Sequence, residues 1–211
     1  MKSTMTTMVL SLTIIASAMG AALGLVHDAT AAPIAQAQEK AKQEALASVL
    51  PGLGDVTMTG PEEVTVKGDS RPVMVYRAMD GNKLKGTAVE SWTMDGYSGE
   101  IRIMVGFNAK GKIIGYEVLQ SAETPGLGAK AGEWFRSEIG NRSIIGTKGE
   151  LAVSKDMPAD AEAQEDANTG ASTQASASAI PIDGITAATI TSRAFLQAVN
   201  RARKAIKKAK N

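Results

Sequence analysis

The first strong pattern is an uncharged apolar segment near the N-terminus. No formally charged side chain lies between Lys2 and Asp28, and residues 9–26 are mainly Val, Leu, Ile, Ala, Met and Gly. A helix of about 20 apolar residues crosses a bilayer core, so we predict a transmembrane helix, with membrane lipid as one partner. The alternative is a cleaved signal peptide, with small residues at 29–31 as its cleavage site. The length of the segment favours retention.

The short positive head before the apolar segment predicts the orientation of the chain. Lys2 and the free amino group would stay in the cytoplasm, and the rest of the chain would lie on the outer, periplasmic face of the inner membrane.

Residues 33–50 have the composition of a helix. They are rich in Ala, Gln, Glu and Lys, Pro33 suits a first helical turn, and Pro51 with Gly52 ends the pattern. We predict a stalk helix here.

Residues 56–118 alternate between strand-like runs and turn signals. The runs, rich in β-branched or aromatic residues, lie at 64–66, 72–78, 84–90, 101–107 and 113–119, with turn signals at 80–82, 95–96 and 108–111. This spacing predicts an antiparallel meander backed by helices, so the predicted fold class is α+β. Residues 133–139 predict a short amphipathic helix, with Trp134, like Trp92, in the core.

The C-terminal segment predicts the strongest helix, at about residues 193–209. Its apolar residues share one face, and the basic residues, which include Arg201 and Arg203, lie largely elsewhere, on a solvated face. Before this segment, residues 156–180 contain almost no large apolar side chain, which predicts a flexible insertion.

Composition restricts the chemistry of the chain. The 211 residues carry a net charge of +1, and the basic C-terminal run has no interleaved aromatic residue, so nucleic acid is not a predicted partner. The chain has no cysteine and a single histidine, His27. Disulfides, iron–sulfur ligation, a thiol nucleophile, a histidine-based metal site and most catalytic triads are therefore excluded. If the protein transfers electrons, a bound organic cofactor must carry them.

Hydroxyl side chains crowd the start of the C-terminal helix. Residues 183–192 read Asp-Gly-Ile-Thr-Ala-Ala-Thr-Ile-Thr-Ser. Free backbone N–H groups and the positive end of the helix dipole favour a phosphate at such a position, and Gly184 allows close approach to the backbone. The alternative interpretation is that Thr191 or Ser192 is an ordinary N-cap.

Two motifs resemble those of a known family. Residues 186–191, Thr-Ala-Ala-Thr-Ile-Thr, resemble the Ser/Thr-Gly-Ala-Thr-x-Thr signature of the FMN-binding domain, which occurs in the G subunit of Rnf electron transport complexes and in the C subunit of the sodium-pumping quinone reductase. Residues 123–128, Glu-Thr-Pro-Gly-Leu-Gly, match the second family motif without substitution, and Pro125 with Gly126 fits the centre of a type II turn. A weaker likeness, to Gly-Tyr-x-Gly-x-Ile, lies at residues 96–101.

The resemblance implies a covalent flavin. In the family the second Thr of the signature carries FMN through a phosphoester bond, and it corresponds to Thr189. The loop at 123–128 forms the pocket near the isoalloxazine ring. Two positions depart from the family pattern, because Ala187 stands in place of the Gly and Ser121 in place of a common His. The implied cofactor-binding residues are Thr189, Glu123, Thr124, Gly126, Leu127, Gly128, Thr186, Ala187, Ala188 and Thr191.

The implied function is electron relay without catalytic residues or a metal. The chain would be the subunit with one covalent FMN in an ion-translocating oxidoreductase complex that couples ferredoxin and NAD redox chemistry to ion transport. Its partners would be the other subunits and a flavin transferase, and Lys130 could compensate the charge of anionic reduced flavin. Two alternatives stay open: the C subunit of the quinone reductase, and a flavin-free extracytoplasmic assembly module, which Ala187 motivates.

These observations divide the chain into five parts. Residues 1–27 form the head and transmembrane helix, 28–50 the stalk, 51–155 the sheet part of the FMN-binding domain, 156–180 the insertion, and 181–211 the attachment segment with the C-terminal helix.

Overall fold

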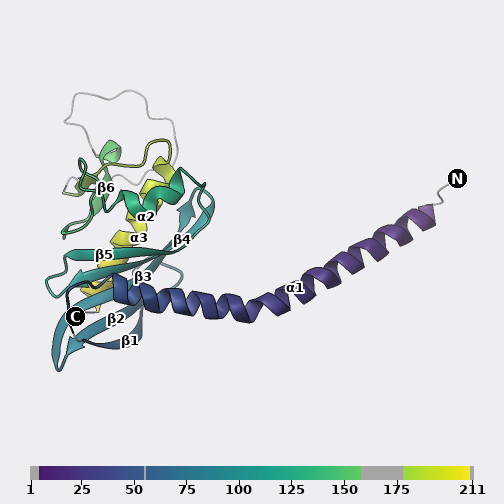
Figure 1. Ribbon diagram of the computed structural model, residues 1–211. Helices are drawn as coiled ribbons and strands as arrows, with labels where there is room; N and C mark the ends of the chain where they lie inside the picture. The colour runs from purple at the N-terminus through teal and green to yellow at the C-terminus, as the bar shows by residue number, and fades with distance from the viewer. Residues whose placement is uncertain (1–4, 55, 158–177, 210–211) are drawn as a thin grey trace. The chain divides into compact units, whose positions relative to one another are not determined.

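A computed structural model describes residues 5–54, 56–157 and 178–209 (Figure 1). The chain separates into two compact units, residues 1–43 and 44–211. The first contains most of one long apolar helix, and the second combines an antiparallel sheet with helices. The predicted α+β class is therefore confirmed. Most of the predicted insertion, residues 158–177, lies outside the described residues.

The long helix, α1 (Met5–Ser48), joins two segments that the sequence predicts as separate helices. Pro33, predicted to begin the second, lies inside α1. There its ring removes one intrahelical hydrogen bond. By length and composition α1 is able to cross a membrane. A signal sequence meets the same criterion, so retention of the segment stays a prediction.

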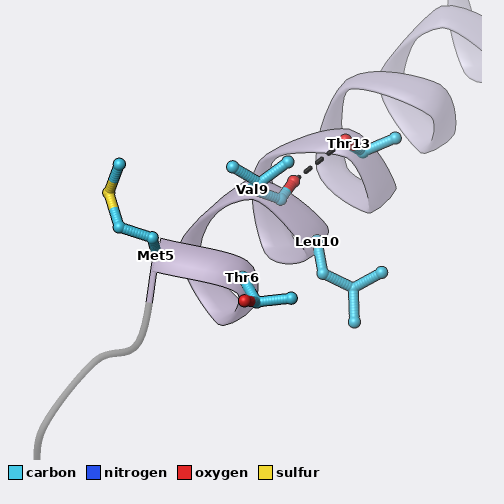
Figure 2. A pocket seen from close by; sticks show the side chains of 5 residues that line it. All are labelled: Met5, Thr6, Val9, Leu10 and Thr13. Carbon is cyan, nitrogen blue, oxygen red and sulfur yellow. Dashed lines mark hydrogen bonds between the residues drawn. The ribbon is translucent and has the colours of Figure 1, made fainter.

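Several hydroxyl groups of α1 donate to backbone carbonyls of the same helix. Figure 2 shows its first turns, where Thr13 donates to the carbonyl of Val9 at 2.9 Å, and Thr30 donates in the same way to Val26 at 2.8 Å. Such bonds satisfy hydroxyls that hydrocarbon cannot solvate. The hollow in Figure 2 lies on the exposed helix surface and is lined by Met5, Thr6, Val9, Leu10 and Thr13.

Five antiparallel strands form the predicted meander, in the order β1-β2-β3-β4-β5. They are β1 (Thr57–Val64), β2 (Val73–Asp80), β3 (Lys83–Gly96), β4 (Gly99–Asn108) and β5 (Ile113–Ser121). The last four cover the predicted runs except for Pro72, which lies just before β2. The first begins seven residues before the prediction, at Thr57 rather than 64, because only Val64 of this edge strand is buried and its sequence shows no alternation.

Helix α3 (Thr189–Lys208) packs on one face of the sheet, mainly against β3 (Figure 1). Its predicted apolar face is buried there. Phe195 stacks on Phe135 with ring centroids 4.6 Å apart and meets Tyr116 edge-on at 5.1 Å. The helix begins four residues earlier than predicted, which places Thr189 in its first turn.

The opposite face of the sheet is covered by the end of α1 and the residues after it. Val49 and Leu50 pack with Ala45 against Ala78, Ala88 and Met104. Gly106 and Gly115, which are cross-strand partners, make the contact close. A Cβ atom on Gly106 would lie 1.8 Å from the carbonyl oxygen of Val49, and one on Gly115 would lie 2.8 Å from it.

Short elements connect the sheet to α3. They are the 3₁₀ turn η1 (Gly128–Lys130), α2 (Ala131–Trp134), β6 (Leu151–Val153), η2 (Ser154–Asp156) and β7 (Ile180–Ile182), with β6 and β7 parallel. The amphipathic helix predicted at 133–139 is wrong beyond Trp134. Phe135 is buried but Ile139 is exposed, so no continuous apolar face extends through those residues.

Two arginines of α3 correct the prediction of a solvated basic face. Arg201 forms a bidentate ion pair with Asp69, at 2.7 and 2.8 Å. Arg203 is buried, and its Nη2 donates to Oγ1 of Thr147 at 3.3 Å. Burial lowers the pKa of the Arg203 guanidinium. The part of the α3 surface that contacts the rest of the domain is therefore wider than its apolar face.

The Gly106 contact gives a stability prediction. We expect Gly106→Ala to reduce the free energy of unfolding by about 3 kcal/mol, because the methyl group would overlap the Val49 backbone. Gly132→Ala is the control, since its Cβ would meet only Val118 Cγ2 at 3.9 Å. Urea unfolding of the detergent-solubilised chain measures both, and equal midpoints would contradict the prediction.

Candidate functional site

The site is organised around one buried carboxylate. Glu123 follows β5 by two residues, and both of its oxygens accept hydrogen bonds. Oε1 accepts the backbone N–H of Ser98 at 3.1 Å, and Oε2 accepts the hydroxyl of Thr191 at 2.6 Å. Glu123 therefore connects the turn between β3 and β4 with the first turn of α3.

The carboxylate fits because two neighbouring residues are glycines, which have no side chain. A Cβ atom on Gly96 would lie 2.7 Å from Oε1 of Glu123. One on Gly128 would lie 2.7 Å from both Oε2 of Glu123 and Oγ1 of Thr191. Real Cβ atoms essentially never approach another heavy atom this closely, so any larger residue at either position would displace the carboxylate.

The loop after Glu123 forms the predicted tight turn. The N–H groups of Leu127 and Ala129 both donate to the carbonyl of Thr124, at 3.2 Å. Gly126 has φ of 76°, as the third residue of a type II turn requires. Thr124, Gly126, Leu127 and Lys130 are exposed, whereas Gly128 is buried beside Glu123.

The alternative interpretation of Thr191 or Ser192 as the N-cap of α3 is wrong. The N-cap residue is Ala188, which has no side-chain cap hydrogen bond. Thr191 and Ser192 lie inside the first turn and are buried, where Ser192 accepts the Ile185 N–H at 2.8 Å and donates to the Ala188 carbonyl at 2.9 Å. Among the described residues, no side chain accepts a hydrogen bond from the N–H groups at the helix start.

Thr189, the residue of the predicted phosphoester, lies at the start of α3. It is the first residue of α3 and is half-buried. Its hydroxyl makes no hydrogen bond to any other residue in the described ranges. Thr186 and Ala187 before it are exposed, whereas Ala188 is buried.

Ala187 adopts a conformation that favours glycine. Its φ is 62°, and it is the only described residue other than glycine with a positive φ. The left-handed region costs an ordinary residue about 1–2 kcal/mol. The conformation explains why a glycine suits this position of the signature, and Ala187 keeps the same backbone at an energetic cost.

The structure brings the two sequence motifs together. Thr191 and Glu123 are 68 residues apart in the chain and share one hydrogen bond. The buried Thr191 side chain holds the 123–128 loop through this hydrogen bond to Glu123. Ser98 and Ser192 were missed by the sequence analysis. Ser98 contributes only its backbone N–H, which leaves no residue-type signal, while the hydroxyl of Ser192 looked like a cap.

The geometry fits the phosphate end of a flavin nucleotide. A half-buried hydroxyl lies beside uncapped N–H groups at the positive end of a 20-residue helix. The glycine-lined loop 123–128 is held against the same turn, and its outer residues are exposed. Within the described residues, no group of three or more His, Cys, Asp or Glu side chains could hold a metal ion.

Comparison with known proteins gives consistent matches. Residues 96–204 match the FMN-binding domain family. The G subunit of the ion-translocating oxidoreductase complex of Shewanella amazonensis is 30% identical over 186 residues, 86% of this chain and 78% of that protein. The G subunit of the Na⁺-translocating ferredoxin:NAD⁺ oxidoreductase complex of Acetobacterium woodii is 29% identical over 198 residues, 90% and 86% of the two chains. The G subunit of the ion-translocating oxidoreductase complex of Yersinia pestis is 32% identical over 139 residues, 64% and 56%.

The strained backbone at Ala187 gives a stability prediction. We expect Ala187→Gly to raise the free energy of unfolding by about 1 kcal/mol, because glycine relieves the left-handed conformation but loses more chain entropy. Ala194→Gly, inside α3, should instead lower it by about 1 kcal/mol or more. A thermal melt of each variant tests this, and destabilisation by Ala187→Gly would refute it.

The Glu123 connection gives a second prediction. Thr191→Val keeps the shape of the side chain but leaves Oε2 of Glu123 without its donor, which should cost about 2 kcal/mol of unfolding free energy. Thr191→Ser keeps the hydroxyl and should reduce the free energy of unfolding by less than Thr191→Val does. Urea unfolding measures both variants, and a valine variant as stable as the serine variant would show that the hydrogen bond contributes nothing.

Proposed function

Because the chain belongs to the FMN-binding domain family found in the G subunits of ion-translocating oxidoreductase complexes, we propose that it is a covalent-FMN electron relay in such a complex. The observation that carries the proposal is the Thr191–Glu123 hydrogen bond. It holds the loop of one flavin motif against the helix start of the other, beside the hydroxyl of Thr189, which bonds to no other described residue.

Thr189 is the proposed attachment residue, with one FMN per chain. Its Oγ1 would form a bond to the flavin-side phosphorus of a flavin dinucleotide donor in a reaction catalysed by a flavin transferase; the pyrophosphate P–O bond would break, and the nucleoside monophosphate would leave with the proton of the hydroxyl. The uncapped N–H groups at the start of α3 would then bind the remaining phosphate oxygens, and the positive helix end would favour their charge. Thr186 lies exposed three residues before Thr189 and would meet the phosphate or ribityl end.

The exposed loop residues are the proposed ring pocket. Thr124, Gly126 and Leu127 would line the isoalloxazine, and the buried Gly128 would hold them close to α3. Bound FMN supplies the electron-transfer chemistry itself. Glu123 and Thr191 position the loop, and Lys130 would compensate negative charge on the reduced ring. Electron relay needs no general acid or base from this chain.

The membrane setting is part of the proposal. Helix α1 would anchor the chain in the inner membrane, with a cytoplasmic N-terminus and the flavin domain on the outer face. The relative from A. woodii is named as part of a Na⁺-translocating ferredoxin:NAD⁺ oxidoreductase. We infer similar coupling of ferredoxin and NAD chemistry to ion transport, with the other subunits of the complex as partners.

Two alternatives are weaker. All three relatives above are named as G subunits, which favours this complex over the sodium-pumping quinone reductase. The flavin-free module is motivated by Ala187. However, Ala187 adopts the left-handed backbone despite its Cβ, so the substitution leaves the signature loop in place.

The attachment residue is tested by mass. Protein purified from its own membranes should carry the mass of one FMN less one water, with fluorescence that survives denaturation and maps to the Thr189 peptide. Thr189→Ala should abolish both and change the unfolding free energy by no more than about 0.5 kcal/mol, since the hydroxyl bonds to no other described residue.

The control is Thr186→Ala, which removes a neighbouring exposed hydroxyl and should keep the full mass. Covalent flavin on the Thr189→Ala protein would refute the assignment. An unmodified wild-type mass would favour the flavin-free alternative.

A further inference from the structure

Arg203 is a buried charge without a counter-charge among the described residues. The residue is 4% exposed, and its Nη2 donates to Oγ1 of Thr147 at 3.3 Å. Its Nε and Nη1 are buried and have no hydrogen-bond partner in the described part of the chain. Burial lowers the pKa of the guanidinium, and no described carboxylate lies close enough to offset this. The fold therefore holds a positive charge inside the domain that the described residues do not neutralise.

Three exposed lysines lie on the segments that surround Arg203: Lys112, Lys148 and Lys207. The first two adjoin a pair of residues joined through their backbones, since the N–H of Ile113 donates to the carbonyl of Thr147 at 3.1 Å. Thr147 is also the residue that accepts the hydrogen bond from Arg203. Lys112 and Lys148 are therefore both next to the segment that contacts the guanidinium.

The third lysine lies on α3 itself. Lys207 follows Arg203 by one helical turn and belongs to the last turn of the helix. The turn before Lys112 contacts the same end of α3, because a Cβ atom on Gly111 would lie 3.9 Å from Cδ1 of Ile206. None of the three lysines forms an ion pair with a described residue. Three ammonium groups and one buried guanidinium are thus gathered at the C-terminal end of α3.

We propose that these three lysines bind a phosphate group, and that the buried charge of Arg203 strengthens their positive potential. Ammonium groups bind phosphate oxygens as point charges, each with three N–H donors. A buried charge is screened by salt much less than an exposed one, so its field acts at physiological ionic strength. The site would lie about 21 Å along α3 from Thr189, because a helix advances by about 1.5 Å per residue. It is therefore separate from the proposed flavin attachment.

The unneutralised guanidinium distinguishes this cluster from an ordinary solvated lysine face. Lys207 alone is explained by the negative end of the helix dipole, which favours a cation in the last turn. Packing does not explain the burial of Arg203, because an apolar side chain of similar volume is often at least as stable in such a place as a buried ion. A positive charge kept inside the domain beside exposed lysines raises the potential that attracts an anion.

A phosphate group can reach this site from two sources. One is the free ion in the surrounding solution. The other is the headgroup of an anionic lipid, since α1 is able to cross a membrane and would keep the chain at a lipid surface. Both sources present the same phosphate oxygens, so the experiment has one arm for each.

The first arm measures the melting temperature of the full-length protein, purified from its own membranes in a non-ionic detergent. Phosphate replaces chloride at constant ionic strength. A phosphate concentration about ten times the Kd should raise the melting temperature of the wild type by about 4 °C. A variant with both Lys148→Gln and Lys207→Gln should lose most of this shift, because two of the three ammonium groups are removed.

Arg203→Met separates the proposed role from a structural one. It removes a buried, unpaired charge, so it should raise the melting temperature in the absence of phosphate. It should at the same time reduce the phosphate-induced shift roughly twofold, since the field of the guanidinium is lost. A residue that only held the fold together would lower the melting temperature and leave the shift unchanged.

Lys155→Gln is the control, because Lys155 is also exposed but lies in η2, outside this cluster. It should keep the full shift. The second arm places the same proteins in nanodiscs of phosphatidylcholine, with or without phosphatidylglycerol, in a phosphate-free buffer. A rise with phosphatidylglycerol that the double lysine variant lacks would identify a lipid headgroup as the ligand. A shift confined to the detergent arm would identify the free ion.

Equal phosphate shifts in the wild type and every variant would be the general effect of phosphate on protein stability, and would overturn the inference. A wild type that responds neither to phosphate nor to phosphatidylglycerol would overturn it too. A full shift in Arg203→Met would contradict the role given to Arg203. Each comparison is between variants of one protein, so phosphate bound at the start of α3 contributes equally to all of them. The result is therefore independent of flavin attachment to Thr189.

Discussion

The candidate site depends on the hydrogen bonds of one buried carboxylate. Both oxygens of Glu123 are occupied, by the N–H of Ser98 and by the hydroxyl of Thr191. A carboxylate buried in this way needs such donors, because burial without them is costly. These hydrogen bonds therefore hold the turn after β3, the loop after β5 and the start of α3 together around the Glu123 carboxylate. The site therefore exists only when the sheet and α3 are assembled.

The packing of helix α3 fixes the residues of its first turn relative to the sheet. Phe195 and its neighbours bury one face of the helix in the core, and Arg201 fixes a flank through Asp69. The first turn of the same helix carries Thr189 at its start and Thr191 toward Glu123. A helix packed along most of its length cannot rotate without breaking core contacts, so the fold sets the position of Thr189.

The sequence predicted the helices and strands best where a hydrophobic pattern or a motif extended over many residues. The apolar stripe of α3 was found because it repeats at helical spacing, and four strand runs were found because they are rich in β-branched or aromatic residues and are separated by turn signals. It failed for β1, which is exposed on both faces, and for residues 135–139, where Phe135 is buried but Ile139 is not. The Thr191–Glu123 contact spans 68 residues and the Ser98 contact uses only backbone. Neither leaves a local pattern, so neither could be predicted.

Contacts on both sides of residues 158–177 position the attachment segment. β6 and β7 pair in parallel, with Val153 opposite Ile182, and Asp156 forms a bidentate ion pair with Arg193 at 2.5 and 2.7 Å. Asp183 accepts the Ser154 hydroxyl at 2.9 Å and the Asn141 N–H at 3.1 Å, directly before the signature segment. Since loop-closure entropy grows slowly with length, these contacts can hold Gly184 to Thr189 in place whatever sequence joins the two strands. An insertion at this point is therefore compatible with a site built from both halves of the domain.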